Sequence, residues 1–373
     1  MKRIRAGIAI VSLVLCPTFS IQANDYEVDG IVVFSFTNSG RCILYQEDSF
    51  AMCVRNSGSW CLKQTPLRYI DRGKERDVLP PGVVTSSDLT NLYQVITFPT
   101  NDLRWVAPPG VTSLTNRPAP RNSQWGFIGR GFIPYGLPDT RIYVLWYGFA
   151  SENYFSNAPE DYLHPITAED SPGSYSKDFR VHARYKLAAS TPKLPVSIQF
   201  SMYRKYMDHS ALQGRKDVFE STNCLFSVKS STNLGALTLP KVIRAEFFGF
   251  PVSSNYNISV PVGSISVLVT NVRRSLTSED FKTPTPTNAV VSDLRPISFD
   301  APVGVALGPM QGWPAPQVGR ARYDQAVRNY LKKQQVARNR PLAWRAIFAS
   351  FVICPVVLFL RRRYKRGSAK SPM

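Results

Sequence analysis

The sequence predicts a mainly β protein that ends in a juxtamembrane helix and one transmembrane helix. Three observations support this fold class. Several segments alternate between apolar and polar residues with a period of two, and hydrophobic runs lie beside basic residues at both ends of the chain. A clear helical spacing first occurs after residue 320. We therefore expect an antiparallel β domain joined to a membrane by its C-terminal end.

The β signal is strongest in the middle of the chain. Segments 179–187 and 195–203 place apolar residues at every second position, which is typical of strands with one buried face. The further strand candidates are 93–98, 141–147, 241–250 and 264–272. The polar stretch 149–177 is either a long excursion or a boundary between two halves. We expect one β-rich extracytoplasmic domain over 24–282.

The N-terminus has the three parts of a secretory signal. Lys2, Arg3 and Arg5 form a basic region, an apolar run extends over 6–15, and Ala23 offers a small residue for cleavage. The run is short for a membrane span. We expect residues 1–23 to be a signal peptide, with an uncleaved N-terminal anchor as the alternative.

The C-terminal end predicts a membrane anchor. Residues 346–360 contain no charge, 342–344 can extend the run, and a basic cluster begins at Arg361. We expect a transmembrane anchor over 342–360 and a basic cytoplasmic tail over 361–373. The main domain then lies on the periplasmic face.

Two further segments precede the anchor. Residues 283–318 contain seven prolines and predict a semi-rigid connector. Residues 319–341 combine basic residues with Tyr323, Ala326, Val327, Tyr330 and Leu331 at helical spacing. We expect a basic amphipathic helix that lies at the membrane surface.

The net charge argues for lipid headgroups and against nucleic acid. The formal charge is +19, but residues 312–373 hold 14 basic residues against the single acid Asp324. The basicity therefore belongs to the membrane flank. We expect anionic membrane lipid to be the partner of the anchor and its basic flanks.

Three cysteines occupy the first strand-like runs. Asn38-Ser39-Gly40 and Asn56-Ser57-Gly58 suit hairpin turns, and so do residues 46–49 between them. With loops centred there, Phe36, Cys42, Cys53 and Cys61 form one row across a four-stranded meander. The companion row on the other face is Ser35, Ile43, Met52 and Leu62.

Neighbouring cysteines of such a row can form a disulfide in an oxidising compartment. We favour Cys53–Cys61, which leaves Cys42 to Cys224 or free. The alternative is that all four are small buried hydrophobes. A zinc site is disfavoured because paired C-x-x-C spacing is absent.

The residues offer little catalytic chemistry. The three histidines are His164, His182 and His209, and Asp208-His209-Ser210 places three triad residue types side by side. Adjacent residues of an extended segment point to opposite sides, so this tripeptide is a weak catalytic candidate. No phosphate-binding loop or cofactor motif is recognised, and we expect no metal and no cofactor.

Aromatic residues are concentrated between residues 125 and 155. Core packing is the simpler interpretation. The functional interpretation is an apolar cavity or groove in a curved sheet. The candidate ligand-binding residues are Trp125, Phe127, Phe132, Tyr143, Trp146 and Phe149.

Several short pieces resemble a group of exported bacterial proteins. They are the strands after Tyr26, the segment Ile142 to Ser151 with Tyr154-Phe155, Leu239-Pro240 at a strand entry, and Ser292 to Arg295. This group is similar to the periplasmic lipoprotein carriers of the outer-membrane lipoprotein-sorting type. The resemblance implies a half-open antiparallel barrel over a helical lid, with a sandwich-like sheet as the other expectation. The C-terminal anchor departs from the soluble carriers, so shuttling across a periplasm is not expected.

Three functions follow from these observations. The leading hypothesis is a non-enzymatic, membrane-anchored extracytoplasmic protein that binds a lipid, or the acyl chain of a lipidated protein, in a curved sheet. The alternative is a cell-envelope structural or interaction module with no small ligand. The third is a hydrolase around His209 or His164.

Overall fold

The computed structural model describes residues 25–38, 41–98, 124–130, 140–166, 179–205, 218–249, 260–274, 276–295, 305–333 and 335–336. The strands are β1 (Tyr26–Asn38), β2 (Arg41–Val54), β3 (Trp60–Asp71), β4 (Lys74–Glu75), β5 (Gly82–Ser87), β6 (Asn91–Thr97), β7 (Gln124–Arg130), β8 (Asp161–Ile166), β9 (Phe179–Leu187), β10 (Pro195–Lys205), β11 (Val218–Leu234), β12 (Leu237–Gly249), β13 (Val260–Arg273), β14 (Thr287–Asp293) and β15 (Val305–Gln311). The helical elements are α1 (Arg141–Leu145), η1 (Trp146–Ala150), α2 (Glu152–Phe155), η2 (Ser278–Phe281) and a helix over 316–333.

The strands form one curved open sheet. Its order is β15-β14-β7-β6-β5-β3-β2-β1-β13-β12-β11-β10-β9-β8, and β4 pairs with β3 outside this path. Neighbouring strands run antiparallel except for β7 and β14, which pair in parallel. The prediction of a mainly β, curved antiparallel sheet is confirmed in outline, with this mixed pair as the difference. Within the described residues the strands make one continuous sheet, so a two-layer sandwich is not formed.

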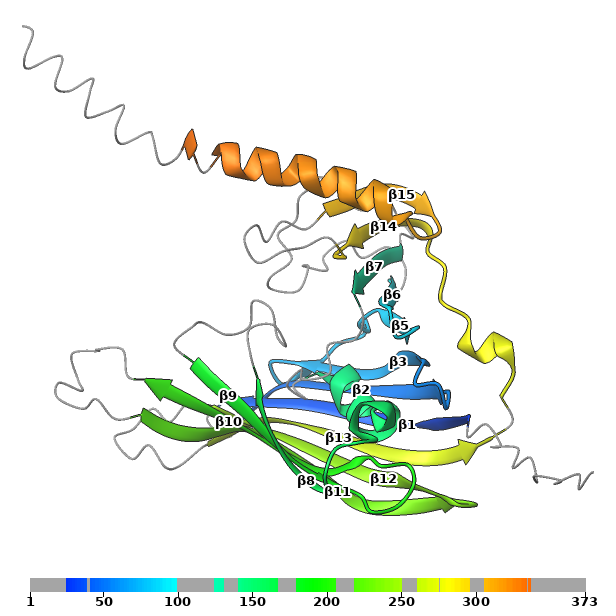
Figure 1. Ribbon diagram of the computed structural model, residues 1–373, viewed down its shortest axis with the longest axis vertical. Helices are drawn as coiled ribbons and strands as arrows, with labels where there is room; N and C mark the ends of the chain where they lie inside the picture. The colour runs from blue at the N-terminus through cyan, green and yellow to red at the C-terminus, as the bar shows by residue number, and fades with distance from the viewer. Residues whose placement is uncertain are drawn as a thin grey trace, which may run out of the picture.

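The sheet has two parts, which Figure 1 shows one above the other. We call β1–β3 with β8–β13 the lower lobe, and β5–β7 with β14, β15 and the helix over 316–333 the upper arm. The lower lobe curves around α1, η1 and α2, which lie on its concave, inner face (Figure 1). We call these three elements, residues 141–155, the inner helical segment.

The lower lobe contains the main core. Thirty buried residues form one cluster, contributed by the inner helical segment and by the strands of the lower lobe. Phe200 and Phe226 on neighbouring strands and Phe155 on α2 are among its fully buried side chains. The predicted strand 179–187 is confirmed with its bounds, and Ala183, Tyr185 and Leu187 are buried as the alternation requires.

One strand prediction and one turn prediction are wrong in detail. Segment 195–203 is a strand, but Val196 is exposed because the β9–β10 register shifts between Pro195 and Ser197. Residues 46–49 form no turn, because β2 runs unbroken over fourteen residues.

The proline-rich stretch 283–318 contributes β14 and β15 to the sheet. Ala289 and Val291 on β14 pack with Ile128 on β7 in a small second cluster. Leu307 on β15 and Tyr323 on the helix form a third. The upper arm thus has its own, much smaller apolar contacts.

Candidate functional site

The inner helical segment replaces a predicted strand. We expected a strand over 141–147 and no helix before residue 320, and both predictions are wrong. Thr140 caps the segment, because its side chain accepts a hydrogen bond from the Tyr143 backbone N–H at 3.4 Å. Every residue from Val144 to Ser151 is buried, so the sequence has no polar face to reveal a helix.

A π-helical turn lies at the centre of this segment, and such turns are frequent at functional sites. Gly148 of this turn packs directly on β12. A Cβ atom at Gly148 would lie 2.4 Å from the Cδ1 atom of Ile243, so the glycine lets the two elements approach without displacing that side chain. Ser151 Oγ donates a hydrogen bond to the Tyr147 carbonyl at 3.0 Å. The segment is therefore seated closely on the sheet.

Aromatic rings fill the space between the segment and the sheet. The ring of Phe155 lies 4.9 Å from that of Tyr185, and the ring of Tyr147 lies 6.1 Å from that of Phe226. Phe149 stacks on Phe50 of β2, with 6.3 Å between the ring centroids. Burial raises the pKa of Tyr147 well above its ordinary value, and the nearby Tyr185 adds to the shift. This part of the inner face is a packed core.

A buried ion pair holds the start of the segment. Arg141 donates to the carboxylate of Asp48 on β2, whose side chain is 2% exposed. Gln46 Nε2 donates to Asp48 Oδ1 at 2.9 Å. Burial raises the pKa of Asp48, although Arg141 and Gln46 act in the opposite direction, and burial lowers the pKa of Arg141. Asp48, one of the polar residues that predicted a turn at 46–49, is therefore a partner of the helix, and Gln46 supports it.

Half-buried aromatic rings occupy the inner face of the upper arm. Trp125 and Phe127 on β7 lie 5.9 Å apart between ring centroids, and Phe98 lies 6.5 Å from Trp125. We call these three residues the aromatic shelf. Leu92 of β6, also on the inner face, packs against the main core. The shelf therefore extends the apolar inner face beyond the inner helical segment.

The six predicted ligand-binding residues fall into two groups. Trp146 and Phe149 are buried residues of the inner helical segment, and Tyr143 is half-buried at its first turn. Trp125 and Phe127 belong to the aromatic shelf. Phe132 lies outside the described residues. The structure thus separates a core group from a surface group that the sequence presented as one cluster.

The predicted cysteine row is half correct. Cys53 lies directly opposite Cys61, and Met52 lies opposite Leu62, as predicted. Cys42 instead pairs with Thr37, because β2 contains no turn and a bulge follows Phe36. Cys42 and Cys224 lie four strand spacings apart, about 19 Å, which is beyond the reach of a disulfide.

Within the described residues, the four cysteines form no disulfide. Cys53 is 8% exposed, and burial raises its pKa to about 12, with Glu27 as the next cause. Burial alone raises the pKa of Cys61 to about 11. Both thiols are therefore weak nucleophiles at neutral pH.

The histidines are not assembled into a catalytic centre by the described residues. Tyr162 OH lies 2.9 Å from His164 Nδ1 on edge strand β8, and His182 pairs in register with Pro165 and Ser201. The tripeptide 208–210 lies outside the described residues. Within the described ranges, no group of three His, Cys, Asp or Glu residues could hold a metal ion.

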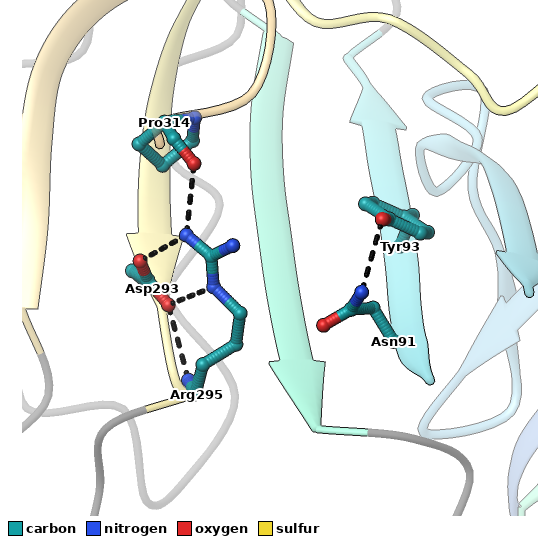
Figure 2. A network of polar contacts seen from close by, with 5 residues as sticks. All are labelled: Asn91, Tyr93, Asp293, Arg295 and Pro314. Carbon is teal, nitrogen blue, oxygen red and sulfur yellow. Dashed lines mark hydrogen bonds and ion pairs between the residues drawn. The ribbon is translucent and has the colours of Figure 1, made fainter. Parts of the chain in front are cut away.

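A polar latch joins β14 to the helix over 316–333. Figure 2 shows the side chain of Arg295, which donates two hydrogen bonds to the fully buried carboxylate of Asp293, at 2.9 and 2.6 Å. Arg295 also donates to the Pro314 carbonyl at 2.8 Å. The same view includes Asn91, whose amide donates to the Tyr93 hydroxyl at 3.2 Å on β6. A Cβ atom at Gly319 would lie 1.9 Å from Asp293 Oδ2. We call Asp293, Arg295 and Gly319 the latch.

The helix held by the latch is basic and only partly covered. Tyr323 packs on Leu307, whereas Leu331 is exposed. Five basic residues, Arg320, Arg322, Arg328, Lys332 and Lys333, stand against the single acid Asp324. In the part of the chain that the structure describes, no helix combines the length and apolarity that a bilayer crossing requires. The predicted anchor 342–360 and signal peptide 1–23 lie outside that part.

Comparisons with known proteins found distant likenesses to solved structures. No family model and no curated protein matches the chain. Among solved structures, a DUF1329 family protein from Desulfovibrio piger shares 10% identity, with a TM-score of 0.30 over 70% of this chain and 91% of that one. A LolA superfamily protein from Nitrosomonas europaea shares 10% identity, with a TM-score of 0.27 over 69% of this chain and 90% of that one.

Proposed function

We propose that this chain is a non-enzymatic, membrane-anchored protein that binds an apolar ligand on the inner face of its sheet. The aromatic shelf carries the proposal. Its rings are half-buried on the inner face of the sheet, next to a packed apolar core. Concave surfaces lined by aromatic side chains with few polar groups are typical of sites for apolar molecules. A lipid or the acyl chain of a lipidated protein fits this surface.

Membrane attachment is the second part of the proposal. Export by residues 1–23 and anchoring by 342–360 would place the sheet on the periplasmic face, with the tail 361–373 in the cytoplasm. The basic helix over 316–333 leads towards that anchor and is held to the sheet by the latch. Its cations favour anionic headgroups, each contributing about 1 kcal/mol near the surface. The aromatic shelf would then stand close to a source of lipid.

We also infer that Cys53 and Cys61 form a disulfide once the chain is exported. They are opposite neighbours on antiparallel strands, where Cβ atoms are about 4.5–5.5 Å apart. An oxidising compartment converts such pairs into disulfides. Mass mapping of non-reduced peptides should recover residues 53 and 61 in one linked species. Two alkylatable thiols in protein purified without reductant would contradict this.

The rival function is a structural module of the cell envelope with no small ligand. One observation favours it, namely that the inner helical segment already fills the inner face of the lower lobe. The two proposals differ in what they assign to the aromatic shelf. In the rival, Trp125 and Phe127 are only packing residues.

Native mass spectrometry of the full chain separates the two functions. The protein would be transferred from detergent to an amphipathic polymer and incubated with vesicles of phosphatidylethanolamine and phosphatidylglycerol. We expect an added mass that organic extraction removes, and its loss in the Trp125→Ala/Phe127→Ala double variant. Tyr45→Ala is the matched control, because Tyr45 is half-buried on β2. A bare wild-type mass after incubation would support the structural module.

A further inference from the structure

Among the residues that the structure describes, two N–H donors on the strands β3 and β7 are buried without a hydrogen-bond partner. They are the side-chain amide Nε2 of Gln64 on β3 and the indole Nε1 of Trp125 on β7. The register places Gln64 opposite Val83, Val83 opposite Ile96, and Ile96 opposite Trp125. The two donors therefore stand at the ends of one transverse row, three strand spacings or about 14 Å apart.

This row lies on the inner face. Phe50 is opposite Gln64 on β2, and the ring of Phe50 stacks on Phe149 of the inner helical segment. Opposite residues of antiparallel strands share a face, so all members of the row point to the same side. The row begins beside the inner helical segment and ends in the aromatic shelf.

Leaving these donors without a hydrogen bond costs free energy, and the neighbouring Gln94 shows that a glutamine on this face can find an acceptor. Gln94, on the adjacent row of the same face, donates from its Nε2 to Thr85 Oγ1 at 3.3 Å. Gln64, at 5% exposure, has no such partner. A buried donor that is denied both water and a partner loses the full desolvation free energy. A bound acceptor would recover it at both ends of the row.

We propose that this row binds an apolar lipid that carries ester groups. Ester carbonyl oxygens accept hydrogen bonds from Gln64 Nε2 and Trp125 Nε1, and the apolar body of the lipid lies against Val83 and Ile96. The inference rests on the proposed function and deepens it, because it names the polar group that the ligand must carry.

The charge of the site favours a neutral ester over an ionised fatty acid. Both donors are neutral, and a carboxylate placed on the row would gain no opposing charge from them. The nearby cation, Arg141, is already paired with Asp48. Asp48 lies on the same face of β2, two residues from the partner of Gln64, so the ion pair adds no net positive charge beside the row. The row therefore favours a ligand whose acceptor oxygen carries no charge.

Equilibrium binding of three matched ligands tests this on the full chain in an amphipathic polymer. The ligands are radiolabelled methyl palmitate, heptadecane and ionised palmitate. We expect methyl palmitate to bind best, with an ester preference over heptadecane of about tenfold. The Gln64→Leu/Trp125→Phe variant keeps the shape of the row without its donors, and should lose that preference while still binding heptadecane.

A control variant and a stability measurement separate binding from folding. Gln199→Leu makes the same change at an exposed glutamine of the lower lobe and should leave the preference intact. Gln64→Leu should raise the unfolding midpoint, because it removes an unpaired buried amide. A lowered midpoint would show that Gln64 is a structural residue and would overturn the proposal.

The proposed function and the ester preference can be overturned by different outcomes. A wild type that binds neither methyl palmitate nor heptadecane would overturn the proposed function together with this inference. A wild type that binds both equally, or a double variant with an unchanged ester preference, would overturn the inference alone.

Discussion

The lower lobe and the upper arm belong to one sheet but are held together by different forces. The lower lobe has one large aromatic core under the inner helical segment. The upper arm has two small apolar clusters and depends on the latch, where a buried carboxylate meets an arginine. Stability is thus concentrated in the lobe, and aromatic side chains remain only half-buried in the arm. A region with a small core of its own can accept a ligand at low cost to the whole fold.

The sharpest test of this contrast compares two phenylalanines. Phe149→Ala should lower the free energy of unfolding by about 3–5 kcal/mol, because it empties a fully buried position of the main core. Phe127→Ala, at a half-buried position of the aromatic shelf, should cost about 1–2 kcal/mol. Urea denaturation of the two variants measures both values. Equal losses would mean that the arm is as tightly packed as the lobe.

The attachment of the inner helical segment gives the second test. Asp48→Asn should cost about 2–4 kcal/mol, because it leaves the Arg141 guanidinium without a counter-charge in a largely buried site. Adding Arg141→Met should recover most of that loss, since an apolar replacement of the whole pair is often neutral. If the double variant is as unstable as Asp48→Asn, the pair does not act as a unit.

The latch gives the third test, and it acts on the arm alone. Gly319→Ala should undock the helix over 316–333 at a cost of about 1–3 kcal/mol, because the new Cβ would collide with Asp293 Oδ2. Gly308→Ala is the matched control on β15, where no atom lies within 4 Å of the added Cβ. Hydrogen exchange should become faster in 316–333 and stay unchanged in β9–β12. Faster exchange throughout would show that lobe and arm unfold together.

The smallest expected effect is a pH dependence of the free energy of unfolding. It comes from Cys53 on β2 and Cys61 on β3, next to the border between the lobe and the arm. In the reduced protein, unfolded Cys53 and Cys61 ionise near their ordinary pKa of 9, whereas the folded thiols stay protonated to about 12 and about 11. The folded state therefore binds more protons between these values, and stability falls as pH rises through about 9 to 11. We expect a loss of about 1 kcal/mol by pH 9.5 relative to a Cys53→Ala/Cys61→Ala variant. The oxidised protein should lack this loss.

The sequence was informative where local pattern and environment agree. The strand 179–187 was found because one of its faces is buried and the other is exposed. The opposition of Cys53 and Cys61 followed from a hairpin in which Gly58 adopts a positive φ of 90°. Such features depend on neighbours a few residues away.

The wrong predictions have a common cause, namely contacts between residues that are far apart in sequence. Residues 144–151 of the inner helical segment are all buried, so they carry no amphipathic period, and the β-branched and aromatic residues among them favour a strand. Asp48 suggested a turn because its partner, Arg141, is far away in sequence, and Gln46 bonds to Asp48. The separation of the aromatic residues into core and shelf depends on which strands pair, and no local signal encodes it. The unpaired donors of Gln64 and Trp125 are likewise a property of register.

The parallel pairing of β7 with β14 has a consequence for how the molecule forms. Val290 pairs with Trp125, and the strands β8–β13 lie between these two residues in sequence. Glu27 likewise pairs with Arg273. Contacts between such distant residues form slowly, because the chain must close a long loop before it gains any pairing. During synthesis β7 emerges early but must wait for β14, so the arm, with its shelf and latch, is completed only after the lobe has been made.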